Sequence, residues 1–262
     1  MLSYRKLAMR VLGRPLHTEG IDSPRPASQR AAALVLTAAM LTTLAAPAFA
    51  DIWHIEDGDI TVKASGTEGK NTVSQGNKKD VEDTDTIITN REDKASSNTV
   101  TIEAKDKDDK VEVTLKDVNI DTSSRNKAAV SVTGEGDTNI KLDGDNALKS
   151  DIYRSGIYGS GSGSLTISGG ENDSLTAQGG SGANGISSSG SLTISGGTVT
   201  ANGDDGGRGI SSSGSVTISG GSTVTANGGS GTISGGDGIW SGGGVTISGG
   251  STVTANGGNG GS

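Results

Sequence analysis

The chain has 262 residues, of which 44 are glycine, none is cysteine and 2% are aromatic, and its formal charge at pH 7 is −8. The absence of cysteine excludes disulfides, a cysteine nucleophile and thiolate metal sites. Residues 1–50 hold six basic and two acidic residues, so residues 51–262 carry a formal charge of −12, which disfavours binding to nucleic acid or to an anionic membrane.

The first fifty residues have the composition of a secretory signal peptide. Six Lys and Arg residues come first, and an uncharged stretch runs from Ala31 to Ala46. Ala48 and Ala50 are small residues at the positions that signal peptidase reads, so we expect cleavage before Asp51. An uncleaved anchor is the alternative, because the uncharged stretch is nearly long enough to span a bilayer. The prediction is a secreted or cell-surface chain with no membrane segment after cleavage.

Residues 51–155 contain short, alternating, β-branched segments separated by polar turns, and no amphipathic helical pattern. Strands are predicted at residues 60–62, 72–73, 86–88, 99–102, 111–115, 129–132 and 140–142. Residues 128–150 have the length and pattern of one coil with three strands. We interpret this part as the irregular N-terminal coils of a solenoid.

Residues 156–262 repeat one unit. Each unit opens on Gly-Ile and continues through Thr-Ile-Ser-Gly-Gly to a second short strand that ends in an amide. The openings are 29, 24 and 29 residues apart, at Gly156, Gly185, Gly209 and Gly238. Such a period of short strands is typical of a solenoid. The aligned amides are expected to bond from coil to coil, and they are Gln178, Asn202, Asn227 and Asn256.

The sequence therefore predicts an all-β, right-handed, single-stranded parallel β-helix. No coil can bury its apolar side alone, and stacking pairs each strand with the coils on either side. The right hand follows from the handedness of parallel crossovers. About 25 residues per coil gives about eight coils. A disordered Gly/Ser linker is the alternative, but the aliphatic residues recur at fixed offsets. The sequence stops in mid-repeat without a polar cap, which suggests a truncated product or an end that pairs with a second chain.

Four segments carry a resemblance to a known family, namely residues 57–62, 113–120, 140–146 and 164–170 (DGDITV, VTLKDVNI, IKLDGDN and SLTISGG). In this order they resemble the bacterial secreted carbohydrate-binding β-helix domain, whose architecture is similar to that of pectate lyases. The resemblance covers nearly all of residues 51–262. It implies a right-handed parallel β-helix, calcium sites at coil turns, and binding to plant-type or acidic polysaccharides.

Carboxylates in the predicted turns are candidate calcium ligands, because calcium takes six to eight oxygens and glycine-rich turns expose carbonyl groups. The alternative is that these side chains are simply solvated. Asp143, Asp145 and Asp151 are predicted to flank one coil corner, and Glu171 and Asp173 to occupy the equivalent turn of the next coil. The other candidates, which break an otherwise neutral repeat, are Asp204, Asp205 and Asp237.

Three aromatic residues are candidate sugar-binding platforms. Tyr153 and Tyr158 lie close together between predicted coils, and Trp240 replaces a serine of the repeated Ile-Ser-Ser pattern. An ordinary surface position is the alternative for each of them. No catalytic residue is predicted, since His54 is the sole histidine after residue 50.

The leading functional hypothesis is a secreted, non-catalytic β-helix that binds extracellular polysaccharide with the help of calcium. One alternative is an adhesin or stalk segment of a larger surface protein. Another is a calcium-dependent polysaccharide lyase, for which Lys149 and Arg154 near Asp151 are the candidate bases.

Overall fold

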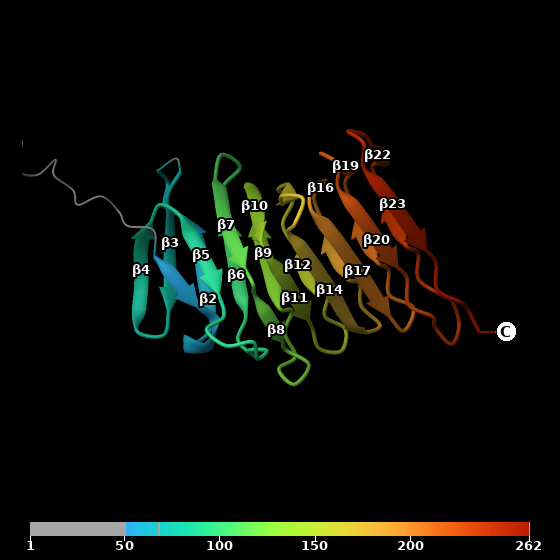
Figure 1. Ribbon diagram of the computed structural model, residues 1–262, viewed down its shortest axis with the longest axis horizontal. Coiled ribbons are helices and arrows are strands. Elements are labelled where there is room, and N and C mark those ends of the chain that lie inside the picture. The colour runs from blue at the N-terminus through green and yellow to red at the C-terminus, as the bar shows by residue number, and fades with distance from the viewer. Residues whose placement is uncertain (1–50, 68, 262) are drawn as a thin grey trace, which may run out of the picture. The chain divides into compact units, whose positions relative to one another are not determined.

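The computed structural model describes residues 51–67 and 69–261, and the predicted signal peptide in residues 1–50 lies outside the described residues. The described part is all-β and contains no α-helix; its one helical segment is a 3-10 turn, η1 (Ile55–Asp57). No helix in this part is long and apolar enough to cross a membrane. The strands wind into a parallel β-solenoid, as predicted from the sequence (Figure 1).

Three sheets form the sides of the solenoid. Sheet A contains β1 (Ile52–His54), β5 (Thr86–Thr89), β7 (Lys110–Lys116), β10 (Asp137–Asp143), β13 (Leu165–Ser168), β16 (Leu192–Ser195), β19 (Val216–Ser219) and β22 (Val245–Ile247). Sheet B contains β4 (Lys78–Asp83), β3 (Asn71–Gln75), β2 (Ile60–Ala64), β6 (Val100–Ala104), β9 (Val130–Gly134), β12 (Ile157–Gly159), β15 (Ile186–Ser188), β18 (Ile210–Ser212) and β21 (Ile239–Ser241). Sheet C contains β8 (Asn119–Asp121), β11 (Asp145–Lys149), β14 (Ser174–Ser181), β17 (Thr198–Asp204), β20 (Thr223–Asn227) and β23 (Thr252–Asn256).

Stacking in register explains why these segments become strands. In sheet A, Ile167, Ile194, Ile218 and Ile247 are successive partners on β13, β16, β19 and β22. Side chains alternate between the two faces of a strand. Of two consecutive residues in one strand, one side chain therefore points into the interior and the other faces solvent. The burial pattern of β13 and β16 follows this alternation.

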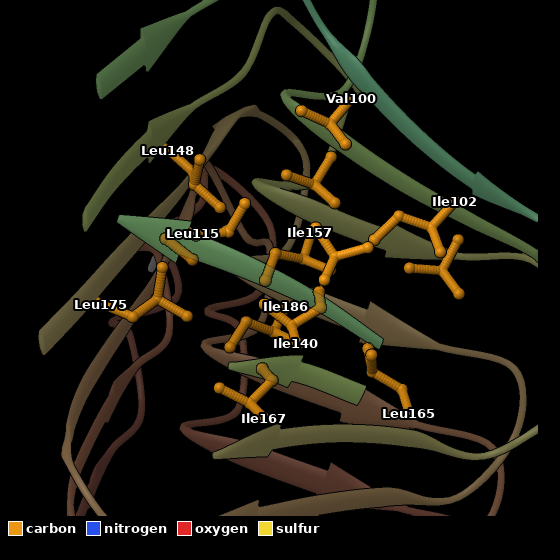
Figure 2. Close-up of a cluster of buried hydrophobic side chains, with 14 of the residues drawn as sticks. Val100, Ile102, Leu115, Ile140, Leu148, Ile157, Leu165, Ile167, Leu175 and Ile186 are labelled. Carbon is orange, nitrogen blue, oxygen red and sulfur yellow. The ribbon is translucent and has the colours of Figure 1, made fainter. Parts of the chain in front are cut away.

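The interior is filled by aliphatic side chains from all three sheets. Figure 2 shows Val100 and Ile157 of sheet B, Ile140 of sheet A, and Leu148 and Leu175 of sheet C within one cluster. All five are buried. The sheets run without interruption past Ser155, since β9 pairs with β12 and β10 pairs with β13. The irregular and regular repeats therefore share one core.

Within residues 51–67 and 69–261, six coils each supply one strand to every sheet, which is fewer than the eight expected from the sequence. The difference arises near the N-terminus, where β2, β3 and β4 pair antiparallel instead of winding. The segment around Thr72 and Val73 is thus a strand, as predicted, but it belongs to a meander at the edge of sheet B. Figure 1 shows β3 and β4 at the blue-green end of the solenoid.

The amides of the C-terminal repeats form the predicted ladder in part. Asn227 Nδ2 donates to Asn202 Oδ1 at 2.8 Å, and Asn256 Nδ2 donates to Asn227 Oδ1 at 2.8 Å. Gln178 does not join them, because its Nε2 donates to the carbonyl oxygen of Gly179. Side-chain bonds between successive coils thus fix the register of β17, β20 and β23.

Candidate functional site

The outer face of sheet B brings two of the three candidate aromatic residues into one column. Strand pairing places Tyr158 beside Ser187, Ser187 beside Ser211, and Ser211 beside Trp240. Tyr158 is 44% exposed and Trp240 is 39% exposed. Adjacent strands lie about 4.8 Å apart, so the two aromatic positions are separated by about 14 Å along the solenoid. We call Tyr158, Ser187, Ser211 and Trp240 the aromatic column.

Tyr153, the third candidate, lies in the turn after β11. Its φ of 58° is in the left-handed region, which is uncommon for a non-glycine residue. The ring packs over Gly182 of the next coil, where a Cβ would lie 2.8 Å from a ring carbon. A hollow of about 230 Å³ is lined by Tyr153, Arg154, Tyr158 and Ser187, among others. The two tyrosines that the sequence places near each other thus border the same hollow.

A second hollow of about 360 Å³ lies beyond Tyr158 on the same face, and Thr101, Ser131, Arg154 and Tyr158 are among its lining residues. Arg154 and Tyr158 border both hollows. The Arg154 Nε donates to Asn126 Oδ1 at 3.2 Å. This bond holds the guanidinium beside the tyrosine, where hydrogen-bond donors and an exposed ring face occur together.

The other end of the aromatic column carries a second cation beside an aromatic ring. The guanidinium carbon of Arg208 lies 4.8 Å from the ring centroid of Trp240, and Arg208 Nε donates to Asp237 Oδ2 at 2.9 Å. The carboxylate therefore orients the guanidinium, and the guanidinium restricts the indole through a cation–π contact. Asp237, a candidate calcium ligand, is in an ion pair in this structure.

Sequence reasoning missed the column itself and the role of Arg208. The alignment of the repeat units could have revealed the column. When Gly156-Ile157-Tyr158 is aligned with the later Gly-Ile openings, Tyr158 has the same position as Trp240 three coils later. The serines of the Ile-Ser-Ser segments do not all lie at the surface. Ser188, Ser211 and Ser212 are buried, and Ser212 Oγ donates to the carbonyl oxygen of Gly190 at 2.9 Å.

The turns between sheets A and C bring several acidic candidates together in successive coils. Asp143 and Asp145 flank the turn from β10 to β11, and Glu171 and Asp173 occupy the equivalent turn of the next coil. Asp143 pairs with Lys116 at 2.6 Å, and Asp145 accepts a hydrogen bond from Ser174 Oγ at 2.6 Å. Glu171 is exposed.

Asp173 acts as a turn cap. Its Oδ2 accepts from the amide of Gly170 at 2.6 Å, and its Oδ1 accepts from the amide of Gly144 in the preceding coil at 3.0 Å. The bond from Gly170 and then the bond from Gly144 lower the pKa of Asp173 below its usual 3.8. This carboxylate therefore joins two coils through backbone donors.

The remaining acidic candidates lie in the turns between sheets C and B, at the other end of the sheet C strands. Asp151 is found there, not at the corner of Asp143 and Asp145 where the sequence was read to place it. Its carboxylate accepts from the amides of Asn126 and Ile152. Asp204 accepts from the amide of Asp205, and the carboxylate of Asp205 accepts from Ser181 Oγ at 3.0 Å.

No group of three or more carboxylate or histidine side chains positioned to hold a metal ion occurs within residues 51–67 and 69–261. Neither of the two candidate bases for a lyase pairs with Asp151. Lys149 Nζ pairs with Asp121 at 3.1 Å, and Arg154 donates a hydrogen bond to Asn126. His54 lies in β1 at the edge of sheet A, whereas the aromatic column is on sheet B. The arrangement on sheet B can stack and hydrogen-bond a ligand.

A scan against protein-family models and searches of curated proteins and of solved structures found no match to this chain.

Proposed function

We propose that the protein is a secreted, non-catalytic carbohydrate-binding β-helix that docks on extracellular polysaccharide. The aromatic column carries this proposal. Tyr158 and Trp240 are exposed at the same outward position of sheet B, and of the two serines between them Ser187 is half-buried and Ser211 is buried. Aromatic faces suit the apolar faces of sugar rings, and the Ser187 hydroxyl can both donate and accept a hydrogen bond.

The cations beside both rings favour polysaccharides that carry carboxylates. Arg154 borders the hollows on either side of Tyr158, and Arg208 stacks on Trp240. These groups supply local positive charge on a chain that is otherwise strongly acidic. A uronate-containing chain lying along the column would meet a guanidinium near each aromatic ring.

Calcium assistance is part of the proposal and is tested with it. The acidic turn residues bond protein donors, so calcium held by them would need further oxygens from the glycan. Bridging of that kind would make binding of an acidic polysaccharide depend on calcium, whereas binding of a neutral one would not.

The test is a calorimetric titration of residues 51–262 with oligogalacturonates and with cello-oligosaccharides, each with and without calcium. We expect binding without product release. Tyr158→Ala and Trp240→Ala should each weaken binding about tenfold or more, which corresponds to about 1.4 kcal/mol for an aromatic anchor.

Thr193→Ala is the matched control, because Thr193 faces outward from sheet A and should leave affinity unchanged. Absence of binding to every glycan, or equal binding by the aromatic variants, would refute the proposal and leave a structural role as a stalk or spacer. Release of unsaturated oligosaccharides during the titration would assign the lyase activity instead.

A further inference from the structure

The outer face of sheet C carries a regular set of threonine side chains. The strands β17, β20 and β23 each begin with Thr-Val-Thr-Ala-Asn, and the valine and alanine of β17 and β20 are buried. Because side chains alternate along a strand, the threonines and the asparagine face outward. In β14, Ser174, Thr176 and Gln178 have the same three positions. We call the outward threonines of the four strands the threonine array, and they are Thr176, Thr198, Thr200, Thr223, Thr225, Thr252 and Thr254.

Strand pairing places the threonine array in two straight rows that cross the strands. The first row is Thr198, Thr223 and Thr252, and the second is Thr176, Thr200, Thr225 and Thr254. Neighbours in a row are about 4.8 Å apart, and the two rows are about 6.7 Å apart along each strand. Figure 1 shows β14, β17, β20 and β23 side by side and pointing the same way. The hydroxyls therefore repeat in two directions.

A ladder of asparagine side chains borders the array and holds its strands at an even interval. The bond from Asn227 to Asn202 and the bond from Asn256 to Asn227 are both 2.8 Å long. Sheets ordinarily twist, and specific side-chain ladders are one device that keeps a sheet flat. The ladder therefore favours a flat and rigid surface across β17, β20 and β23.

The hydroxyls of the threonine array are free. Among the residues that the structure describes, none of them makes a hydrogen bond to the protein. Serines elsewhere in the same coils do, since Ser212 Oγ donates to the carbonyl oxygen of Gly190 and Ser222 Oγ to that of Ile194. The outward positions of the array and of its bordering amides are also uncharged, whereas the preceding strand β11 has Asp145 and Lys149 there.

The outward residues of β17, β20 and β23 are the same although the segments that follow these strands differ. Six positions separate the end of β17 at Asp204 from the start of β18 at Ile210, but twelve separate Asn227 of β20 from Ile239 of β21. Packing of the interior does not require identical residues on the outer face. The regularity of the array is therefore a property of the surface.

This chemistry indicates the kind of partner that the array fits. One exposed hydroxyl contributes little net binding free energy, so the array gains only when many hydroxyls bond at once to a partner with the same repeat. The lack of charge disfavours an ionic mineral. A crystalline glycan presents sugar ring faces, which stack on aromatic rings, and the array contains none. Hexagonal ice presents rows of oxygen atoms that both donate and accept, at spacings similar to those of the array.

We propose that the threonine array of sheet C binds the surface of ice. The hydroxyls bond water molecules of the crystal face, and the threonine methyl groups pack against the gaps between them. This surface lies on sheet C, whereas the proposed glycan-docking surface lies on sheet B, and the two proposals do not depend on each other.

The experiment measures how much of residues 51–262, carrying a fluorescent label, is taken into a polycrystalline ice hemisphere grown slowly from dilute solution. Serum albumin with the same label is the reference protein. We expect at least tenfold more of the β-solenoid than of albumin in the ice, and we expect faceted crystals when single ice crystals grow in its solution. Exclusion of the wild type from ice would overturn the proposal.

Thr225→Lys places a long charged side chain in the middle of the array. We expect at least a tenfold loss of uptake into ice with the unfolding midpoint unchanged, and the same from Thr223→Lys, whose site is more exposed. Thr193→Lys is the matched control, because Thr193 has an outward position in the middle of sheet A. Undiminished uptake of both array variants, or an equal loss in Thr193→Lys, would overturn the proposal.

The glycan-docking proposal is tested separately in the same variants. Tyr158→Ala and Trp240→Ala should be taken into ice as the wild type is, and Thr225→Lys should bind oligogalacturonates as the wild type does. Failure of one proposal is therefore distinguishable from failure of the other. Adsorption to microcrystalline cellulose that Thr225→Lys abolishes, together with exclusion from ice, would assign the array to a glycan surface and overturn the ice proposal.

Discussion

At the scale of single residues, a buried contact between an indole and a carboxylate joins β1 to the end of β4. Trp53 is 1% exposed, and its Nε1 donates to Asp83 Oδ2 at 2.7 Å. Asp83 is fully buried and also accepts from the amide of Asp85 at 3.2 Å. A carboxylate in this position is stabilised only while its donors remain. The same indole lies under Lys78, whose Nζ is 4.8 Å from the ring centroid.

Trp53→Phe should therefore lower the free energy of unfolding by about 1–3 kcal/mol, because it leaves a buried oxygen of Asp83 without its donor. Urea denaturation followed by circular dichroism measures the change. Trp240→Phe is the matched control, since its ring is on the surface and the change there should be within about 0.5 kcal/mol. Equal stability of Trp53→Phe and the wild type would show that the contact contributes nothing.

Asp173 gives a prediction for pH. Its pKa is lowered in the folded protein below the usual 3.8, so the unfolded chain takes up a proton first as the pH falls. The stabilisation is fully present above pH 3.8 and is lost as the pH falls through the folded pKa. Asp173→Asn should be less stable than the wild type at pH 7, by less than about 1 kcal/mol because the group is near solvent.

The difference between wild type and Asp173→Asn should shrink as the pH is lowered from 5 to 2. Urea midpoints across that range measure it. The pKa values of Asp57, Asp59 and Asp121 are also lowered, so both proteins should lose stability in acid against this common background. A difference that stays constant with pH would contradict the capping role of Asp173.

At the scale of elements, stacking in register determines how much each aliphatic residue contributes. Ile194 and Ile247 have the same position in β16 and β22, yet the first is fully buried and the second is 51% exposed. Ile194→Ala should cost about 2–5 kcal/mol. Ile247→Ala should cost less than about 1 kcal/mol. Chemical denaturation of the pair measures this, and similar losses would mean that coil stacking does not govern stability.

In the N-terminal region, sequence reasoning found β2, β3 and β5, but it found neither β4 nor the direction of every pairing. Alternation in residues 60–88 predicted strands, and strands are present there. Alternation does not reveal which way a neighbouring strand runs, so the antiparallel meander of β2, β3 and β4 was not predicted.

For the candidate site, the sequence repeat was the feature that best predicted which residues lie side by side. The aligned units placed Trp240 at a serine position, and the structure confirms this pairing with Ser211. The distribution of acidic residues was harder to interpret. Spacing along the chain put Asp151 with Asp143 and Asp145, but a whole strand, β11, separates the two corners. Asp151 follows Asp145 by six positions, and the segment from Asp145 to Asp151 includes all of β11, so the two side chains lie at different corners.

At the scale of the whole solenoid, stability should vary from coil to coil. Each inner coil has neighbours on both sides, whereas β21, β22 and β23 pair with described strands on one side only. In a solenoid, stability depends mainly on contacts between neighbouring units. Hydrogen–deuterium exchange should therefore be slowest in β9 to β17 and faster by about tenfold or more in β21 to β23. Uniform exchange across all coils would mean that the solenoid opens only as a single unit.

The aromatic column has a consequence for how the protein can change over generations. Tyr158 and Trp240 are separated by whole coils, and the coils between them are built from nearly the same sequence. Duplication or loss of one unit in the gene would lengthen or shorten the gap between the two rings by about 4.8 Å without altering either ring. Slippage in a repetitive DNA segment would thus act directly on the spacing of the two rings, and with it on the length of glycan that the proposed docking surface would contact.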